Sequence, residues 1–146
     1  SDGSLSELLM LPGGGSKNPA TKETVENRLH YIKMKGNEVF KLAVKIMSDA
    51  ACKALKQCKL SVEDIDCFIP HQANKRILDA VVRKMKLPSE KIYFNVAKYG
   101  NMSSASTAVA LCEAYHSGKI KGGSIVVLDA FGAGLVWGSC VIQWQK

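Results

Sequence analysis

Three short stretches of the chain carry residues suited to binding or chemistry. In the first, His71, Gln72 and Asn74 follow an apolar run and precede a helical pattern, a junction where α/β proteins bind ligands. In the second, Asn101 stands in a tight turn just before another helical pattern. The third is the glycine-rich bend 131–134, whose small residues let backbone N–H groups approach a substrate oxygen. Three loops that end strands can converge on one pocket.

Each stretch also has a plainer interpretation. A single histidine at a strand end is often a structural group with a satisfied hydrogen bond, and a Gly-Ala-Gly bend is usually a turn. Asn101 follows a glycine, so it can adopt left-handed backbone or cap the helix after it. His30 and His116 lie in polar surroundings and receive no role.

The elements that position these stretches follow from the periodicity of apolar residues. Spacings of three and four predict helices over 37–55, over 73–87 and, in a segment rich in alanine and serine, over 103–117. Apolar runs predict strands over 65–69, 92–96, 124–129 and 135–144. Strands that alternate with helices predict a layered α/β sheet. Residues 1–36 are expected to be a loop-rich lead-in segment and 37–146 an α/β domain.

Composition is that of a soluble globular domain, with 47% hydrophobic and 23% charged residues among 146. The net charge of +7 favours an acidic partner, whether a nucleic acid, an anionic membrane, a phosphorylated cofactor or an acidic protein. No apolar run approaches the about 20 residues that span a bilayer, and the N-terminus does not resemble a leader peptide. We therefore expect a protein with no membrane segment and no targeting signal.

The chain has five cysteines, an odd number with no CxxC spacing. Because most lie in apolar stretches, we expect buried thiols in a reducing compartment. The three histidines are far apart in the sequence, so we expect no metal site. The cysteines are Cys52, Cys58, Cys67, Cys112 and Cys140.

Taken in order, the motifs resemble the C-terminal half of the β-ketoacyl-acyl-carrier-protein synthase III family, which are thiolase-fold condensing enzymes. The resemblance runs from end to end of the chain. It rests on residues 2–4, 7–9, 34–41, 70–74 (Pro-His-Gln-Ala-Asn), 99–106 and 130–139. It implies a thiolase-like fold, of which this chain supplies the C-terminal half as a mixed β-sheet layered between helices, usually within a homodimer.

The resemblance also implies an activity. Family members condense an acyl group from acyl-CoA with malonyl-acyl carrier protein, release CO₂ and so initiate fatty acid synthesis. His71, through its Nε2–H, and Asn101 would donate hydrogen bonds to the malonyl thioester oxygen as the enolate forms. The backbone N–H of Ala133 would contribute to a second oxyanion hole, which serves acyl transfer.

Binding residues are implied in the same way. The tunnel for the pantetheine arm would be lined by Met34, Asn37, Phe40, Ala73 and Asn74. The acidic carrier protein would meet Lys41, Arg76, Arg83 and Lys84, in agreement with the positive net charge. No cofactor is expected beyond CoA and the carrier protein's phosphopantetheine, which act as substrate carriers.

One feature departs from the family pattern. The family's nucleophilic cysteine lies in the N-terminal half, and no cysteine here has the expected setting. Cys112 lies within the alanine-rich helix and Cys140 in the last strand, and neither has a strand-to-helix turn or a nearby base in the sequence. We expect this chain to be inactive without the N-terminal half, against which the 103–117 helix would be buried.

Other interpretations stay open. A hydroxymethylglutaryl-CoA synthase-like, polyketide or head-to-head condensing enzyme shares the histidine and asparagine, and a non-catalytic binding half is a further alternative. A nucleic-acid-binding domain is supported only by the charge and lacks aromatic stacking positions. We expect neither nucleic acid nor membrane as a partner, and a cytoplasmic location, although a plastid enzyme without its transit peptide would look the same.

Overall fold

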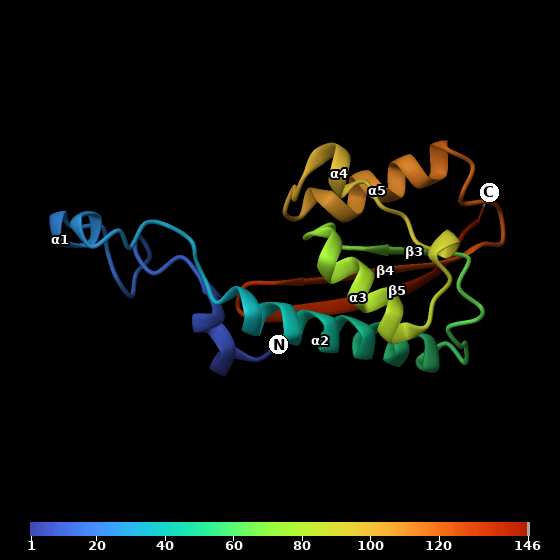
Figure 1. Cartoon of the computed structure of the whole chain (residues 1–146), viewed down its shortest axis with the longest axis horizontal. Coiled ribbons are helices and arrows are strands. Elements are labelled where there is room, and N and C mark those ends of the chain that lie inside the picture. The colour runs from blue at the N-terminus through green and yellow to red at the C-terminus, as the bar shows by residue number, and fades with distance from the viewer. Residues whose placement is uncertain (146) are drawn as a thin grey trace. The chain divides into compact units, whose positions relative to one another are not determined.

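A computed structural model describes residues 1–145 (Figure 1). The chain divides into two compact units. The first comprises residues 1–42 with 132–136, and the second comprises residues 43–131 with the chain from Trp137 onward. The two are described separately below.

The first unit is more regular than the sequence predicts. It contains a 3₁₀ helix η1 (Gly3–Leu8), strand β1 (Leu9–Met10), helix α1 (Lys22–Glu26) and strand β2 (Lys33–Met34). β1 and β2 pair antiparallel, with Leu9 opposite Met34. The expectation of a loop-rich segment did not include these elements, because strands of two residues leave no periodicity and their partners are far apart in the sequence.

Helix α2 (Gly36–Gln57) confirms the predicted helix. Within the second unit a row of buried residues recurs at four-residue spacing, which places them on one side of the helix. The row is formed by Ala43, Met47, Ala51 and Leu55, and Ile46 and Ser48 are buried as well. Lysines such as Lys45, Lys53 and Lys56 are exposed, so the helix is amphipathic as expected.

A three-stranded sheet organises the second unit. Its strands are β3 (Cys67–Pro70), β4 (Ile125–Gly132) and β5 (Val136–Gln143), in the order β3-β4-β5. β3 and β4 are parallel, with Cys67 opposite Val126. Only three residues connect β4 to its neighbour β5, which requires an antiparallel pair, because a parallel crossover needs a dozen residues or more. The sheet is therefore mixed, as predicted.

Helices cover both faces of this sheet (Figure 1). The second-unit part of α2 lies with α3 (Lys75–Met85) on one face, and α4 (Val96–Tyr99) with α5 (Ala105–His116) lies on the other. Alternation along the strands points Cys67 and Ile69 toward α5, where they form a buried cluster with Ala110 and Ala114. Small side chains on α5 thus allow it to pack closely on its own sheet.

The opposite side of α5 is open in this chain. Ala105, Ala108, Cys112 and Tyr115 are exposed and recur at three- and four-residue spacing. This exposed side is the one that an N-terminal half would cover if the predicted burial of the helix is correct, and that burial stays a prediction. Among the described residues, no helix is long and apolar enough to cross a bilayer.

The strand predicted over 92–96 is not formed. Its first residue pairs with Phe68 in an isolated bridge, and Val96 already begins α4. The buried side chain of Gln72 explains the difference, because its Oε1 accepts the backbone N–H groups of Asn95 at 3.0 Å and Val96 at 3.2 Å. An amide side chain therefore takes the place of a neighbouring strand.

Candidate active site

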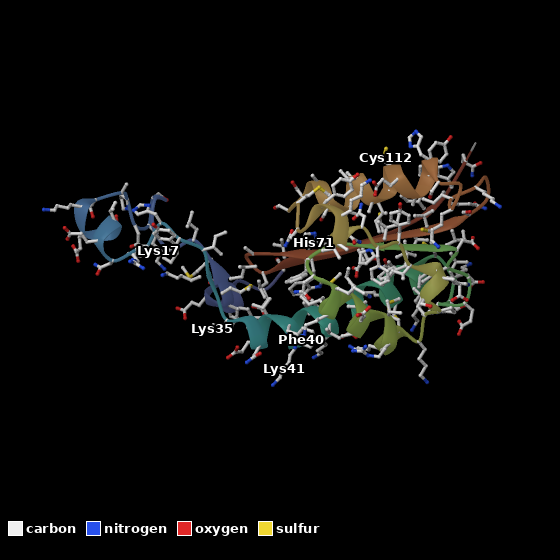
Figure 2. All side chains as sticks on the ribbon, turned by 45° about the horizontal axis from the view of Figure 1, so that its top comes forward. Lys17, Lys35, Phe40, Lys41, His71 and Cys112 are labelled. Atoms are coloured by element: carbon white, nitrogen blue, oxygen red, sulfur yellow. The ribbon has the colours of Figure 1, made fainter. Side chains whose placement is uncertain are left out.

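His71 follows β3 directly and lies at the carboxyl edge of the sheet (Figure 2). Its backbone N–H donates to the carbonyl oxygen of Asp129 at 2.6 Å, which extends the parallel pairing by one residue. The ring is half-buried and meets the Phe131 ring edge to face, with centroids 6.3 Å apart. Burial lowers the pKa of His71 and therefore favours the neutral imidazole at neutral pH.

One nitrogen of the His71 ring is held in place. Nδ1 lies 2.6 Å from the Oγ of Ser106, a fully buried residue in the first turn of α5. Ser106 Oγ also lies 2.8 Å from the carbonyl oxygen of Ser103. No described residue forms a hydrogen bond with Nε2, so this nitrogen is the one available to a substrate.

Asn101 lies in the turn between α4 and α5. The turn begins at Gly100, whose φ of 71° is in the region that glycine adopts without strain. Asn101 Oδ1 accepts the backbone N–H of Ser103 at 2.9 Å. Because the amide oxygen is used in this way, the Nδ2 hydrogens remain as donors. The exposed side chain of Asn101 thus presents Nδ2 as a donor, and the catalytic role predicted for this residue stays a prediction.

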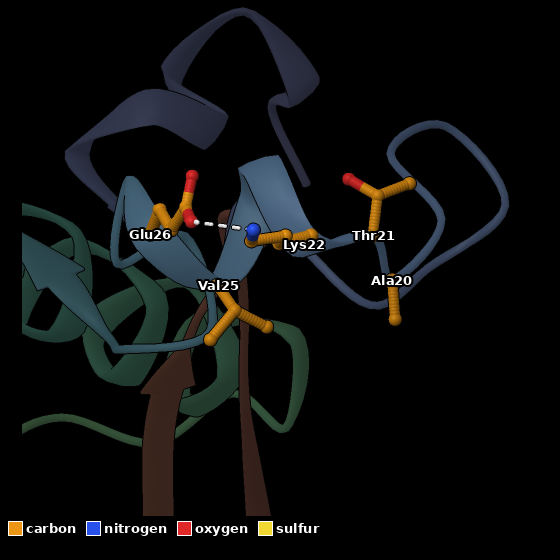
Figure 3. A pocket seen from close by; sticks show the side chains of 5 residues that line it. All are labelled: Ala20, Thr21, Lys22, Val25 and Glu26. Carbon is orange, nitrogen blue, oxygen red and sulfur yellow. Dashed lines mark ion pairs between the residues drawn. The ribbon is translucent and has the colours of Figure 1, made fainter.

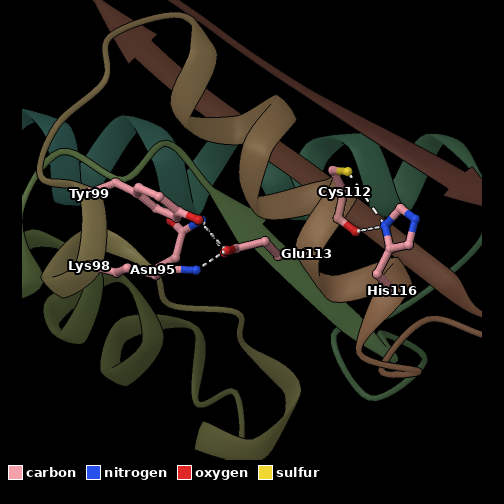
Figure 4. A network of polar contacts seen from close by, with 6 residues as sticks. All are labelled: Asn95, Lys98, Tyr99, Cys112, Glu113 and His116. Carbon is pink, nitrogen blue, oxygen red and sulfur yellow. Dashed lines mark hydrogen bonds and ion pairs between the residues drawn. The ribbon is translucent and has the colours of Figure 1, made fainter.

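A cluster of polar contacts connects α4 to α5 (Figure 4). Glu113 accepts hydrogen bonds from Lys98 Nζ at 2.8 Å, the Tyr99 hydroxyl at 2.6 Å and Asn95 Nδ2 at 2.9 Å. These donors, Lys98 first among them, hold the pKa of Glu113 at about 2. Glu113 therefore anchors residues 95–99, the segment that leads into the Asn101 turn, to α5. Sequence reasoning missed it, although a lone carboxylate in an alanine-rich helix was a signal.

Gln72 holds the N-terminal end of the same segment in place through hydrogen bonds to its backbone. Its Nε2 donates to the carbonyl oxygens of Pro70 at 2.8 Å and Tyr93 at 3.1 Å, while its Oε1 accepts the two N–H groups described above. The side chain is fully buried, and all four hydrogen bonds involve backbone groups. Gln72 is thus a structural residue of this motif, whereas the neighbouring His71 presents its ring.

The other residues of the motif begin helix α3. Asn74 is the N-cap of α3, and its Oδ1 accepts the backbone N–H of Ile77 at 3.0 Å. Ala73 is half-buried beside it. Asn74 therefore has a local structural role, and the pantetheine contact predicted for both residues stays a prediction.

Helix α3 is strongly basic, and some of its charges have partners. Lys84 Nζ lies 3.1 Å from Asp49 Oδ1, and Lys75 Nζ lies 2.7 Å from Asp79 Oδ1. Three of the residues predicted to meet a carrier protein lie exposed on this helix, namely Arg76, Arg83 and Lys84. Their role as a binding surface stays a prediction.

The remaining predicted site residues belong to the first unit. Met34 lies in β2 with 61% of its surface exposed, and Asn37, Phe40 and Lys41 lie in the first turns of α2 (Figure 2). Ala133 lies exposed in the turn between β4 and β5. Their predicted roles in the tunnel, the carrier surface and the oxyanion hole stay predictions.

The expectation of buried thiols is wrong for four of the five cysteines. Only Cys67 is buried, which raises its pKa to about 11, while Cys52, Cys58, Cys112 and Cys140 are exposed. Cys52, Cys112 and Cys140 lie on the exposed side of their helix or strand, and Cys58 lies in the turn that follows α2.

Cys112 has a histidine beside it, yet this pair does not form a nucleophile and its base (Figure 4). His116 Nδ1 lies 2.8 Å from the backbone carbonyl oxygen of Cys112 and 3.5 Å from its Sγ. A carbonyl oxygen only accepts, so Nδ1 carries a hydrogen and cannot take the proton of the thiol. This agrees with the expectation that the nucleophile lies outside this chain.

Asp129 is a buried carboxyl that the sequence reasoning did not single out. It is 1% exposed, and neither carboxylate oxygen has a hydrogen-bond partner among the described residues. Burial raises the pKa of Asp129 to about 8, so the group is mostly protonated at neutral pH. An aspartate within an apolar strand was the signal for it.

Metal sites and surface hollows are two further kinds of candidate site in the described part of the chain. No group of three His, Cys, Asp or Glu side chains in residues 1–145 could hold a metal ion. A shallow hollow beside α1 is lined by Ala20, Thr21, Lys22, Val25 and Glu26 (Figure 3). It contains an exposed ion pair between Lys22 and Glu26 at 3.8 Å and none of the predicted catalytic residues.

Comparison with known proteins places this arrangement in a family. The model of the 3-oxoacyl-[acyl-carrier-protein] synthase III C-terminal family matches residues 55–144. A β-ketoacyl-[acyl-carrier-protein] synthase III of Caldanaerobacter subterraneus is 54% identical over 145 residues, which cover 99% of this chain and 44% of that protein. The corresponding protein of Clostridioides difficile is 51% identical over 144 residues, with 99% and 44% covered.

Solved structures support the same family assignment. The crystal structure of a 3-oxoacyl-(acyl carrier protein) synthase III from Pseudomonas aeruginosa superimposes with a TM-score of 0.86 at 38% identity, covering 100% of this chain and 42% of that one. A priming β-ketosynthase of a polyketide pathway gives a TM-score of 0.85 at 32% identity, covering 99% and 43%.

The mixed sheet between helices, with a histidine at the end of β3 and an asparagine before α5, defines a thiolase-like α/β domain. The chain belongs to the 3-oxoacyl-[acyl-carrier-protein] synthase III C-terminal family. The resemblance seen in the motifs is thereby confirmed. The chain spans about 44% of the length of the curated relatives that it matches.

Proposed function

We propose that this chain is the decarboxylation half of a β-ketoacyl-acyl-carrier-protein synthase III. The whole enzyme would condense an acyl-CoA starter with malonyl-acyl carrier protein and so initiate fatty acid synthesis. The observation that carries the proposal is the pair of oriented donors. Asn101 has its amide oxygen occupied by Ser103, and His71 is a half-buried ring whose Nε2 is available.

These two donors suit the chemistry of decarboxylation. When malonyl thioester loses CO₂, the bond between its carboxyl carbon and its α-carbon breaks, and the electron pair moves toward the thioester oxygen. Donors fixed beforehand around that oxygen stabilise the enolate without having to reorganise. A neutral imidazole and an amide donate in this way while they leave the enolate unprotonated at its α-carbon.

The enolate carbon then attacks an acyl group held on a cysteine. The new carbon–carbon bond forms as the acyl carbon–sulfur bond breaks and the thiolate leaves. The cysteine would come from the N-terminal half, since among residues 1–145 no cysteine has an activating base beside it. The backbone N–H of Ala133 would stabilise the tetrahedral oxyanion of acyl transfer.

Substrate delivery uses the remaining predicted residues. The pantetheine arm of CoA or carrier protein would pass between Met34, Asn37, Phe40, Ala73 and Asn74. The exposed basic side chains of Lys41, Arg76, Arg83 and Lys84 are complementary to an acidic carrier protein. We further propose that the enzyme needs no other cofactor and works as a cytoplasmic homodimer.

The test is the intact mass of the full-length protein that carries this chain, measured under denaturing conditions before and after acetyl-CoA. We expect the mass of one acetyl group to be gained on a cysteine outside the present 146 residues, located by peptide mapping. Addition of malonyl-acyl carrier protein should then remove the acetyl group and yield the β-ketoacyl product. A protein that never acylates, or that acylates on one of the five cysteines here, would overturn the proposal.

A second condensing function is favoured by one comparison. The priming β-ketosynthase of a polyketide pathway is 32% identical to this chain over the aligned residues and has the same fold there. Such an enzyme would use the same donors with a different starter or a different carrier protein. Competition between fatty-acid and polyketide carrier proteins in the assay above distinguishes the two.

A further inference from the structure

Ser106 has one hydroxyl hydrogen and two groups that can accept it. Its Oγ lies 2.6 Å from His71 Nδ1 and 2.8 Å from the carbonyl oxygen of Ser103. A hydroxyl donates one hydrogen bond, so it can serve only one of them. If the hydroxyl donates to the Ser103 carbonyl, then Nδ1 must donate to Oγ, and the neutral ring has its hydrogen on Nδ1. If the hydroxyl donates to His71 Nδ1, the hydrogen of the neutral ring is on Nε2.

The partners available to each acceptor favour donation to His71. The carbonyl oxygen of Ser103 also has a second donor, the backbone N–H of Ser106 at 3.2 Å. Among the described residues Nδ1 has no partner other than Ser106. Turning the hydroxyl toward His71 therefore leaves neither acceptor without a hydrogen bond.

We propose that Ser106 is a positioning residue, whose hydroxyl donates to His71 Nδ1 and so keeps the hydrogen of the neutral ring on Nε2. The inference rests on the proposed function, in which Nε2–H is the donor to the malonyl thioester oxygen. Ser106 is fully buried and acts through His71, without touching a substrate.

The same short segment orients the other donor. Ser103 has a φ of 55°, a left-handed conformation that directs its backbone N–H to Asn101 Oδ1. Three residues later Ser106 holds the His71 ring. Residues 103–106 thus fix which atom each donor presents, Nδ2 for Asn101 and Nε2 for His71.

The experiment is nitrogen NMR of the full-length protein with ¹⁵N-labelled histidine at neutral pH and without substrate. The His71 signals are assigned by their loss in His71→Ala. We expect the directly bonded hydrogen on Nε2 and a bare, hydrogen-bonded Nδ1. In Ser106→Ala we expect the Nδ1 signal to shift and both tautomers to be populated, with malonyl decarboxylation reduced about tenfold. Ser106→Thr, which keeps the hydroxyl, should restore the wild-type signals.

A matched control is available in α2. Ser48 is likewise a buried helical serine, but its hydroxyl donates to the carbonyl oxygen of Val44 at 2.7 Å and contacts no histidine. Ser48→Ala should leave the His71 signals unchanged. A hydrogen on Nδ1 in the wild type would overturn the inference, as would identical His71 signals in the wild type and Ser106→Ala. Both NMR results are obtained without substrate, so they test the role of Ser106 independently of the proposed function. Failure of the proposed function would instead appear as wild-type protein that does not decarboxylate malonyl thioester.

Discussion

The backbone N–H of Ser103 donates to the side-chain oxygen of Asn101 at 2.9 Å, and this bond decides which end of the amide faces outward. With Oδ1 occupied, Nδ2 is presented as a donor. The orientation is produced within a three-residue turn and needs no substrate. In the proposed reaction this is what prepares the site for negative charge on the thioester oxygen.

The first prediction separates the two ends of this amide. Asn101→Asp keeps an oxygen that accepts the Ser103 N–H, so the turn should survive, but a carboxylate cannot donate to the enolate and repels its charge. We expect malonyl decarboxylation to fall by about 10²- to 10³-fold, the loss typical of one oxyanion donor. Decarboxylation is measured as CO₂ release from malonyl-acyl carrier protein, in the full-length protein.

Asn27→Asp is the control for this change, because Asn27 is an exposed residue at the end of α1 outside the proposed site. It should release CO₂ at the wild-type rate. Equal activity of Asn101→Asp and wild type would show that Nδ2 donates nothing in the reaction.

The second prediction concerns the cluster around Glu113. Glu113→Gln removes the charge that Lys98 and Tyr99 share, so the segment leading to the Asn101 turn should open more often. Backbone amides of Lys98 and Gly100, which bond to Asn95 and Val96, should exchange their hydrogens faster.

Hydrogen exchange followed by mass spectrometry of the 95–101 peptide measures this effect. Glu63→Gln provides the control, since Glu63 is an exposed carboxylate far along the chain from this segment. Unchanged exchange in Glu113→Gln would mean that Gln72 alone holds α4 in place.

The third prediction follows from the buried Asp129. Its pKa is raised from 3.8 to about 8, so the folded protein binds a proton here that the unfolded chain releases between these values. The stability from this group is complete below about pH 4 and declines by about 1.4 kcal/mol per pH unit until about pH 8. Asp129→Asn does not titrate, so its stability relative to wild type should rise with pH in this window.

Urea unfolding of the full-length protein at pH 5, 6 and 7 measures the difference. Asp64→Asn serves as the control, because hydrogen bonds from the backbone and side chain of Ser61 lower the pKa of Asp64. Asp64 is therefore ionised in both the folded and the unfolded state at these pH values, and its difference from wild type should stay constant. A constant difference between Asp129→Asn and wild type across the three pH values would show that Asp129 titrates normally.

Much of the fold could be predicted from local patterns. The helices α2, α3 and α5 each bury one side at three- and four-residue spacing, and β3 and β4 are apolar runs, so periodicity located them. The strand expected over 92–96 failed because its backbone bonds to the side chain of Gln72, more than twenty positions earlier. No local pattern contains that information.

In the candidate site, too, some residues could be selected from local sequence and others depend on distant contacts. His71 and Asn101 stood out because each follows an element end next to a turn. Ser106 and Glu113 did not, because their importance depends on partners that lie 35 and up to 18 positions away. Candidate residues at the ends of elements could thus be selected from the sequence, whereas the residues that hold them in place through distant contacts required coordinates.

The central claim is that His71 serves decarboxylation and not acylation of the cysteine. The most direct test measures both half-reactions in full-length His71→Ala, with His116→Ala as the control for an exposed histidine outside the site. Cysteine acylation by acetyl-CoA is followed by intact mass, and CO₂ release from malonyl-acyl carrier protein is followed without a primer. The account predicts that His71→Ala still acquires the acetyl group while CO₂ release is abolished. Equal loss of both half-reactions, or unchanged CO₂ release, would contradict it.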